Sequence, residues 1–592
     1  MQTSRVVFLN FAALLSGALP LVTAHGGGAM SMSEAHNATT EAVAEVWEPN
    51  YFRHSEYAGW MYAHIALMIL GSVFVLPPAI MLSIARSRYH IPAQILFHAV
   101  NGLGLFTGFI YNHATPDLYV NNSHHPIGWI VTAFTVVWTL LSIASTFAAR
   151  QRLAPRTAQR PSIAQGMLHH HHLEQYLDSP QNDRFSSDSG NFSGESRANS
   201  SESIFQKEHV PEQPFLGQEE SEDDSRDHDE GQSFLGRSRV SRFMAHSAKR
   251  FSGAKAIAAL RLSQVVLEKL LLIMGFLAIT TGFIVYGGIF RKREVFSGLA
   301  HYIKGAIFFW YGLLTLGRWM GAFSNFGWAW NVRPSRPLVS EWQSRVPSAE
   351  FTESFVIWLY GASNVWLEHL NNWGQGWSPQ DFEHVSITLL FFGGGLFGML
   401  IESSWARNMM NTTVEVQKSQ EGEDVASGAR FSGSSEAAFE PDQQWAHPAT
   451  YKHPMNPMPA LVIMLLGIMM SSHHQNSMVS TMMHAQWGSL FTGFALARAV
   501  TYILMYVRPP TSHFPSRPPS ELVASFCLIG GGIMFMNSAH DSVSTIEANG
   551  LDAMTIFTIT MGLTGCIMAW EVVCFAIKGW ATRKEKGLAG DA

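Results

Sequence analysis

The chain has 592 residues, of which 47% are hydrophobic and only 14% are charged, and its formal net charge is −6. This mildly acidic balance argues against a nucleic-acid-binding surface, which needs clustered Lys and Arg. The three cysteines, Cys527, Cys566 and Cys574, fall inside strongly apolar stretches, so we expect neither a disulfide framework nor a CxxC metal site.

The first 24 residues have the form of a secretory signal peptide. Arg5 lies just before the apolar run VVFLNFAALLSGALPLV, and Val22-Thr23-Ala24 supplies a small-residue cleavage site. We expect residues 1–24 to be removed and residues 25–57 to form a lumenal or extracellular tail. An uncleaved membrane span is the alternative, although the apolar core is short for one.

Eleven further segments resemble membrane spans, each of which needs about 20 mostly apolar residues. They lie near 58–84, 93–113, 126–148, 264–288, 299–321, 352–370, 384–404, 458–475, 483–506, 520–538 and 551–578. The expected fold is therefore all-α, a polytopic transmembrane helical bundle of about 11 spans.

Lys and Arg between the spans predict that the mature N-terminus is lumenal or extracellular. Arg291-Lys292-Arg293 breaks this pattern, because the scheme places it on the same outer side. The chain is then a multi-pass protein of the secretory pathway, in the ER, vacuole or plasma membrane. The sequons at Asn37 and Asn121 would be on the glycosylated side.

Two polar tracts interrupt the spans. Residues 151–252 contain EESEDDSRDHDEG, and residues 407–452 are also rich in Ser and Glu. Such composition buries too little apolar surface to fold alone, so both are expected to be disordered cytosolic linkers. The first separates a three-span module (58–150) from an eight-span module (253–582), which a cytosolic tail (583–592) follows.

Histidines lie in or beside the spans of the N-terminal module. An ionisable residue there is costly and marks a candidate site, and imidazole is a common axial ligand of haem iron. The candidate cofactor-binding residues are His64, His98, His124 and His125.

The order of these histidines resembles the cytochrome b561 core. The resemblance rests on His64 with Leu67, Met68, Pro77, Ala85 and Arg86, on His98 with Gly102 and Gly104, and on His124 with Ile127 and Gly128. It implies haem b held by His64 and by His124 or His125, with the two glycines giving the macrocycle room. The span that follows has no histidine to pair with His98, so one haem is expected.

The C-terminal module has ligand-type residues at the span ends that the topology places on one side. The candidate metal ligands are His301, His369, Glu383, His384, His473, His474 and His484. Three such ligands with an open position suit catalytic zinc, whereas neighbouring methionines favour copper. Lys304 and Arg318 are candidates to pair with carboxylates, or to extend toward the membrane surface.

The whole arrangement resembles the fungal Ytp-like family, named for a yeast putative transmembrane protein. The segments that carry the resemblance are YAHIALMILG, LPPAIMLSIARSRYH, HYIKGAIFFWYGLLTLGRWMGAF, EHLNNWGQGWSPQDFEHVSIT and SSHHQNSMVSTMMHAQWG. The family implies an integral membrane protein with a suggested relation to electron-transport proteins.

Four functions are consistent with these patterns. The leading interpretation is a haem b electron carrier or metal reductase with a bis-histidine site. The alternative is a membrane protein that binds zinc or copper through clustered histidines, either as an intramembrane hydrolase with Glu383 or Asp381 as base, or as a metal transporter. A scaffold protein without chemistry would make every histidine replaceable.

Overall fold

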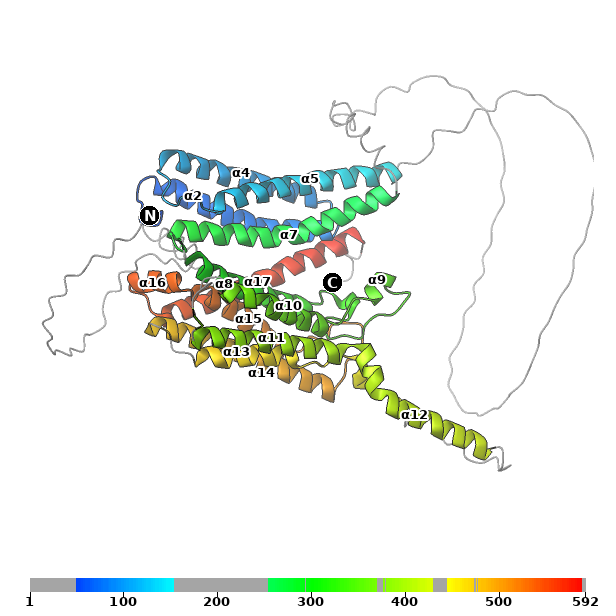
Figure 1. Ribbon diagram of the computed structural model, residues 1–592. Helices are drawn as coiled ribbons and strands as arrows, with labels where there is room; N and C mark the ends of the chain where they lie inside the picture. Colours follow the sequence, from blue (N-terminus) through cyan, green and yellow to red (C-terminus); the bar gives the residue numbers. More distant parts are fainter. Residues whose placement is uncertain are drawn as a thin grey trace, which may run out of the picture. The chain divides into compact units, whose positions relative to one another are not determined.

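The computed structural model describes residues 49–153, 254–292, 294–369, 376–377, 379–429, 445–472, 475 and 477–587. These residues are helical with short connections (Figure 1). The longer elements are α2 (Ala58–Ile69), η1 (Leu70–Val75), α3 (Leu76–Ile84), α4 (His90–Ala114), α5 (His124–Leu153), α7 (Ala254–Gly287), α8 (Glu294–Met320), α10 (Ala349–His369), α11 (Pro379–Glu402), α12 (Ser404–Ala429), α13 (Met458–Ser471), α14 (Met478–Val507), α15 (Ser520–Asn537), α16 (His540–Ala548) and α17 (Ala553–Glu585). The all-α prediction is confirmed.

Eight stretches of the described chain are long and apolar enough to cross a membrane, fewer than the eleven expected. The other three expected spans correspond to α8, α10 and α13. Helix α13 has only 14 residues, whereas α8 carries Lys304 and Arg318, and α10 carries Glu350 and Glu353. Polar residues lower the apolar character of α8 and α10, and these helices prove to line the main cavity.

The first span changes its winding in the middle. Helix α2 continues through the π-helical η1 into α3, which has Pro77 and Pro78 near its start. Proline has no N–H to donate to the preceding turn, so the backbone hydrogen-bond pattern of the helix changes just before Pro77 and Pro78.

Helix α7 packs with the N-terminal helices, although its sequence lies beyond the linker. Leu271 of α7 is fully buried with Phe97 of α4 and Trp138 of α5 in one apolar cluster. The N-terminal core is therefore a four-helix arrangement of α2–α3, α4, α5 and α7 (Figure 1). The two expected modules are not separate, because the described parts of residues 1–145 and 258–592 form one compact unit. Helix α17 links them, with Trp570 Nε1 donating to the Val73 carbonyl at 2.8 Å.

The remaining helices pack closely through glycines. Helix α8 lies along α15, and α10 lies along α11. A Cβ at Gly305 of α8 would come within 2.6 Å of the Gly532 carbonyl oxygen of α15. Helix α14 contributes the buried Trp487, Phe491 and Phe494 to the largest apolar cluster. The absence of a side chain at Gly305 thus sets the distance between α8 and α15.

Contacts between loops define one end of the bundle. The Tyr119 hydroxyl, between α4 and α5, donates to the Ile289 carbonyl, between α7 and α8, at 2.8 Å. The Phe290 N–H donates to Asp541 in the first turn of α16 at 2.8 Å. Burial raises the pKa of the nearby Tyr51 hydroxyl, which donates to Asp117.

Arg291, which belongs to the basic group that breaks the predicted charge pattern, lies at this end of the bundle and has a structural role. Arg291 donates to the carbonyls of Gly288, Pro49 and Leu118, and its guanidinium lies 4.7 Å from the Tyr119 ring centroid. The residue joins three loops, so it would be retained here whatever the orientation of the chain.

The segment expected as a disordered loop at 407–452 differs from that expectation. Its first part belongs to α12 (Ser404–Ala429), and residues 449–452 form the short helix η4 (Ala449–Lys452). Met, Gln and Glu, which favour helix, are frequent in α12, and the described side chains from Asn408 to Glu421 are mostly exposed. The expected signal peptide 1–24, linker residues 154–252 and tail residues 588–592 lie outside the described residues.

Candidate functional site

Two histidines face each other inside the N-terminal core. His64 of α2 and His124 of α5 have ring centroids 6.3 Å apart. His64 Nδ1 donates to the Gly104 carbonyl at 2.8 Å, and His124 Nδ1 lies 3.3 Å from Thr281 Oγ1, whose own proton goes to backbone carbonyls. Because both Nδ1 atoms are engaged, Nε2 is the atom that each ring can offer to a metal.

Two glycines lie against these rings. A Cβ at Gly108 of α4 would come within 2.6 Å of His64 Nδ1, and a Cβ at Gly282 of α7 within 3.0 Å of His124 Cε1. Sequence reasoning selected Gly102 and Gly104 instead. A Cβ at Gly102 would meet no atom of another side chain or helix within 4 Å. A Cβ at Gly104 would meet Met68 at 3.0 Å and Leu67 at 3.2 Å, and neither histidine ring. Gly108 lies one turn after Gly104 on the same helix face, a spacing that could have indicated it.

The other two N-terminal histidines lie elsewhere. His98 Nε2 is 2.8 Å from the Thr139 hydroxyl, and His98 precedes Gly108 by ten residues, about 15 Å along α4. His125 is exposed and accepts a hydrogen bond from Trp129 Nε1 at 3.3 Å. Of the alternatives left open, His124 therefore faces His64.

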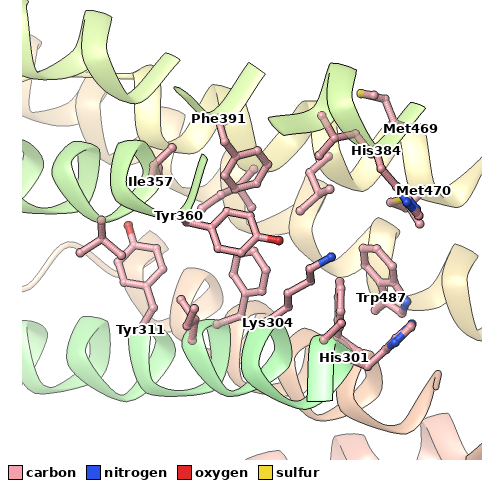
Figure 2. Close-up of a pocket in the computed structure, with 18 of the residues that line it drawn as sticks. His301, Lys304, Tyr311, Ile357, Tyr360, His384, Phe391, Met469, Met470 and Trp487 are labelled. Atoms are coloured by element: carbon pink, nitrogen blue, oxygen red, sulfur yellow. The ribbon is translucent and has the colours of Figure 1, made fainter. Parts of the chain in front are cut away.

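A cavity of about 860 Å³ lies among α8, α10, α11, α13 and α14. Its walls are mainly aromatic and aliphatic side chains, with a smaller number of polar groups. Figure 2 shows Lys304 of α8 extending into this space toward Tyr360 of α10, with His384, Met469 and Met470 near one end and Tyr311 near the other.

Four of the seven predicted metal ligands line this cavity: His301, Glu383, His384 and His484. The His301 and His484 ring centroids are 6.4 Å apart, and each Nδ1 donates to the carbonyl four residues earlier in its helix. The side chain of His369, and both His473 and His474, lie outside the described residues.

Within the described chain, three ligand-type groups approach within 4.8 Å of one another at Glu294, His540 and Asp541, and not at the cavity. A zinc or copper site in the cavity thus stays a prediction.

A buried charge network adjoins the cavity through Glu353, which lines it. Arg318 pairs with Glu350 at 3.1 Å and with Glu353 at 2.6 Å, which is the first of the two alternatives that the sequence left open for Arg318. Arg498 pairs with Glu353 at 3.3 Å, and its Nε lies 2.8 Å from Glu521 Oε1. All five side chains are buried. Both guanidinium groups lie near the Trp330 ring, at 4.3 Å and 5.8 Å from its centroid.

Sequence reasoning missed most of this network. Glu353 and Glu521 were not selected because each stood at the start of a predicted span, where charge is ordinary, and Arg498 was not selected although it lies inside the span 483–506. The available signal was an arginine inside the apolar run LFTGFALARAVTYILM of α14. Buried ionisable groups in membrane helices are paired and mark functional regions, so the network and cavity belong to one candidate site.

Comparison with known proteins gives the family. Residues 274–579 match the model described as "Protein YTP1-like, C-terminal", and residues 46–148 match a domain of unknown function (DUF2427). An uncharacterized membrane protein of Schizosaccharomyces pombe is 35% identical over 550 residues, covering 93% of this chain and 99% of that protein. The chain belongs to the YTP1-like family.

Two Saccharomyces cerevisiae relatives of this YTP1-like chain align over shorter lengths. An uncharacterized membrane protein is 33% identical over 321 residues, or 52% of this chain and 47% of that protein. The protein named YTP1 is 21% identical over 322 residues, or 53% and 55%. No solved structure matches.

The family membership and the apolar helices make the chain an integral, multi-pass membrane protein in contact with the bilayer. Two of these relatives are named as membrane proteins, and none of the three names states a reaction. The predicted resemblance to the Ytp-like family is therefore confirmed, and the chemistry depends on the site geometry.

Proposed function

We propose that this YTP1-like protein is a membrane electron carrier that holds one haem b between His64 and His124. The imidazole pair carries the proposal. Two imidazoles that bind one metal ion from opposite sides have centroids about 6 Å apart, since each metal–nitrogen bond is about 2 Å. The observed 6.3 Å agrees with that spacing.

The surroundings support the same use. The Gly104 carbonyl and Thr281 hydroxyl fix the neutral tautomer in which Nε2 is the ligand atom. The absence of side chains at Gly108 and Gly282 lets the two rings lie directly against the backbone of α4 and α7. When bound, haem with two histidine ligands supplies one-electron transfer rather than oxygen binding. The acceptor proposed at the outer face is an oxidised metal ion such as Fe(III) or Cu(II).

The optical spectrum of the full-length protein, purified in detergent, tests this proposal. We expect a Soret band that shifts on reduction with dithionite, because six-coordinate haem b absorbs strongly. His64→Ala and His124→Ala should each remove the band. His125→Ala should keep it, because His125 is exposed and outside the pair. A colourless native protein, or a His64→Ala protein with an unchanged spectrum, would show that no haem is held there.

Gly108→Ala should weaken haem retention without removing a ligand. The new methyl group would meet His64 Nδ1 at 2.6 Å, so the ring would have to shift. We expect about 10- to 100-fold faster haem loss to apomyoglobin, the size of effect that disturbing the support of a metal ligand has on affinity. Gly102→Ala is the matched control, because its Cβ would meet no other side chain or helix within 4 Å. Equal haem loss from both variants would contradict this role of Gly108.

A further inference from the structure

The buried charge network beside the cavity contains more carboxyl groups than guanidinium groups. All of its side chains are buried, so solvent cannot compensate for a charge that is left over. Arginine keeps its proton in proteins, so three ionised glutamates would leave one negative charge without a partner. The members are two arginines and three glutamates, Arg318, Arg498, Glu350, Glu353 and Glu521.

Within the described chain, no cation other than these two arginines pairs with the three glutamates. Lys304 of α8 lines the cavity, but its side chain extends toward Tyr360 (Figure 2). Tyr311 of α8 and Tyr502 of α14 lie near Arg498, and a tyrosine hydroxyl is neutral at physiological pH. The groups around the network therefore do not supply the missing positive charge.

Hydrogen bonds do not compensate for the missing charge either. Glu353 accepts from Nη1 of Arg318 at 2.6 Å and from Nη1 of Arg498 at 3.3 Å. Neither oxygen of Glu521 accepts a hydrogen bond, because Arg498 Nε lies 2.8 Å from Oε1 without hydrogen-bond alignment. Glu402 at the end of α11 adds a further carboxyl group beside the network. The network is therefore short of donors as well as of positive charge.

A single bound proton removes this imbalance. An uncompensated charge in a protein interior is so costly that a buried carboxyl group takes up a proton instead. With one carboxyl group neutral, two guanidinium groups face two carboxylates. The three glutamates share the same two arginines, so their ionisations are coupled and the proton belongs to the network rather than to one residue.

Glu353 connects the network with the cavity, because its side chain lines the cavity wall. Three buried donor atoms of the lining have no protein acceptor: Trp310 Nε1, the Tyr311 hydroxyl and Trp487 Nε1. Water commonly satisfies such groups, and the cavity of about 860 Å³ has room for it. Water beside Glu353 can carry a proton to and from the network.

We propose that the network is a proton-binding site, which holds one proton among its three glutamates and exchanges it with the cavity through Glu353. Uptake forms one O–H bond on a carboxylate oxygen and turns a hydronium ion of the cavity into water, so no electron is transferred. Proton relays are a known use of ionisable groups buried in membrane helices. The proposal does not depend on haem at His64 and His124, because α8, α10, α14 and α15 supply all five side chains.

Infrared spectra of the full-length protein in phosphatidylcholine nanodiscs at neutral pH test the proposal. A protonated carboxyl group has a C=O stretching band that a carboxylate lacks, and this band shifts in D2O when the proton exchanges. Glu350→Gln, Glu353→Gln and Glu521→Gln each leave two guanidinium groups facing two carboxylates. Each substitution should therefore remove from the native spectrum a band with the area of one carboxyl group, whichever glutamate carries the proton.

Glu341→Gln is the matched control. Glu341 also pairs with two arginines, Arg336 at 3.0 Å and Arg345 at 2.6 Å, but its side chain is 58% exposed, so water compensates for its charge. Its carboxyl band should equal that of the native protein. Combining Glu350→Gln with Glu521→Gln should remove no more of the band than either substitution alone, because the network holds only one proton.

The proposal is wrong if none of the three network variants loses the band. It is also wrong if only one of them does, because that result would indicate a single neutral glutamate rather than a proton set by charge balance. A native band that keeps its position in D2O would show that the proton does not exchange with the cavity. This last measurement uses the native protein and does not depend on the folding of any variant.

Discussion

Replacing Arg498 with methionine is expected to lower the free energy of unfolding by about 3–5 kcal/mol. The guanidinium pairs with Glu353 and with Glu521, whose side chain is completely buried. Removing Arg498 leaves a carboxylate in the protein interior without its cation, and the desolvation cost of that charge is then uncompensated. Unfolding of the detergent-solubilised protein by SDS, followed by tryptophan fluorescence, measures the change.

The double variant Arg498→Met, Glu521→Gln separates loss of charge balance from loss of packing. Removing the unpaired carboxylate should recover much of the lost stability, because a neutral amide is less costly to bury. Arg508→Met is the matched control, since Arg508 follows the same helix but is exposed. A double variant as unstable as the single one would show that packing, rather than the buried charge, is responsible.

Replacing Gly305 with alanine is expected to destabilise the protein by about 1–3 kcal/mol, as overpacking does in other tightly packed interiors. The new Cβ would meet the Gly532 carbonyl oxygen at 2.6 Å and Met536 N at 2.8 Å. These are backbone atoms, so relief requires α8 to move away from α15. Helix α8 carries His301, Lys304 and Tyr311, so the movement would also change the cavity lining.

Gly562→Ala is the opposite case. Gly562 lies inside α17, and its Cβ would meet no other side chain or helix within 4 Å. Alanine should therefore stabilise the helix by up to about 1 kcal/mol, because it has the higher helix propensity. The SDS unfolding assay should give shifts of opposite sign for the two substitutions. Equal shifts would show that close approach of α8 and α15 does not limit stability.

The local pattern along the chain predicted the helices but not all of their roles. Apolar runs located α4, α14 and α17 because length and hydrophobicity alone are enough for a span. Helices α8 and α10 look less apolar because Lys304 and Glu353 line the cavity, and Arg318 and Glu350 belong to the buried charge network. The polar residues of α8 and α10 therefore indicated the site, but in the prediction of membrane spans they were taken as ordinary variation in hydrophobicity.

The sequence did not predict which side chains of different helices contact one another. His64 was selected as a ligand, but the choice between His124 and His125 depended on which face of α5 meets α2. Adjacent residues on a helix point about 100° apart, so one ring is inside and the other is exposed. The assignment of α7 to the N-terminal core likewise depends on Leu271 and Thr281 contacts made beyond a linker of about a hundred residues.

The sequence by itself determined that this is an all-helical, multi-pass membrane protein of the YTP1-like family with histidines at the ends of its spans, because hydrophobicity and composition act locally. Only the tertiary structure decided that His64 faces His124, that His301, His384 and His484 share a cavity, and that two arginines and three glutamates form one network. These facts depend on helix rotation and on close approach at glycines such as Gly305 and Gly108. Both are set by packing between segments far apart in the chain.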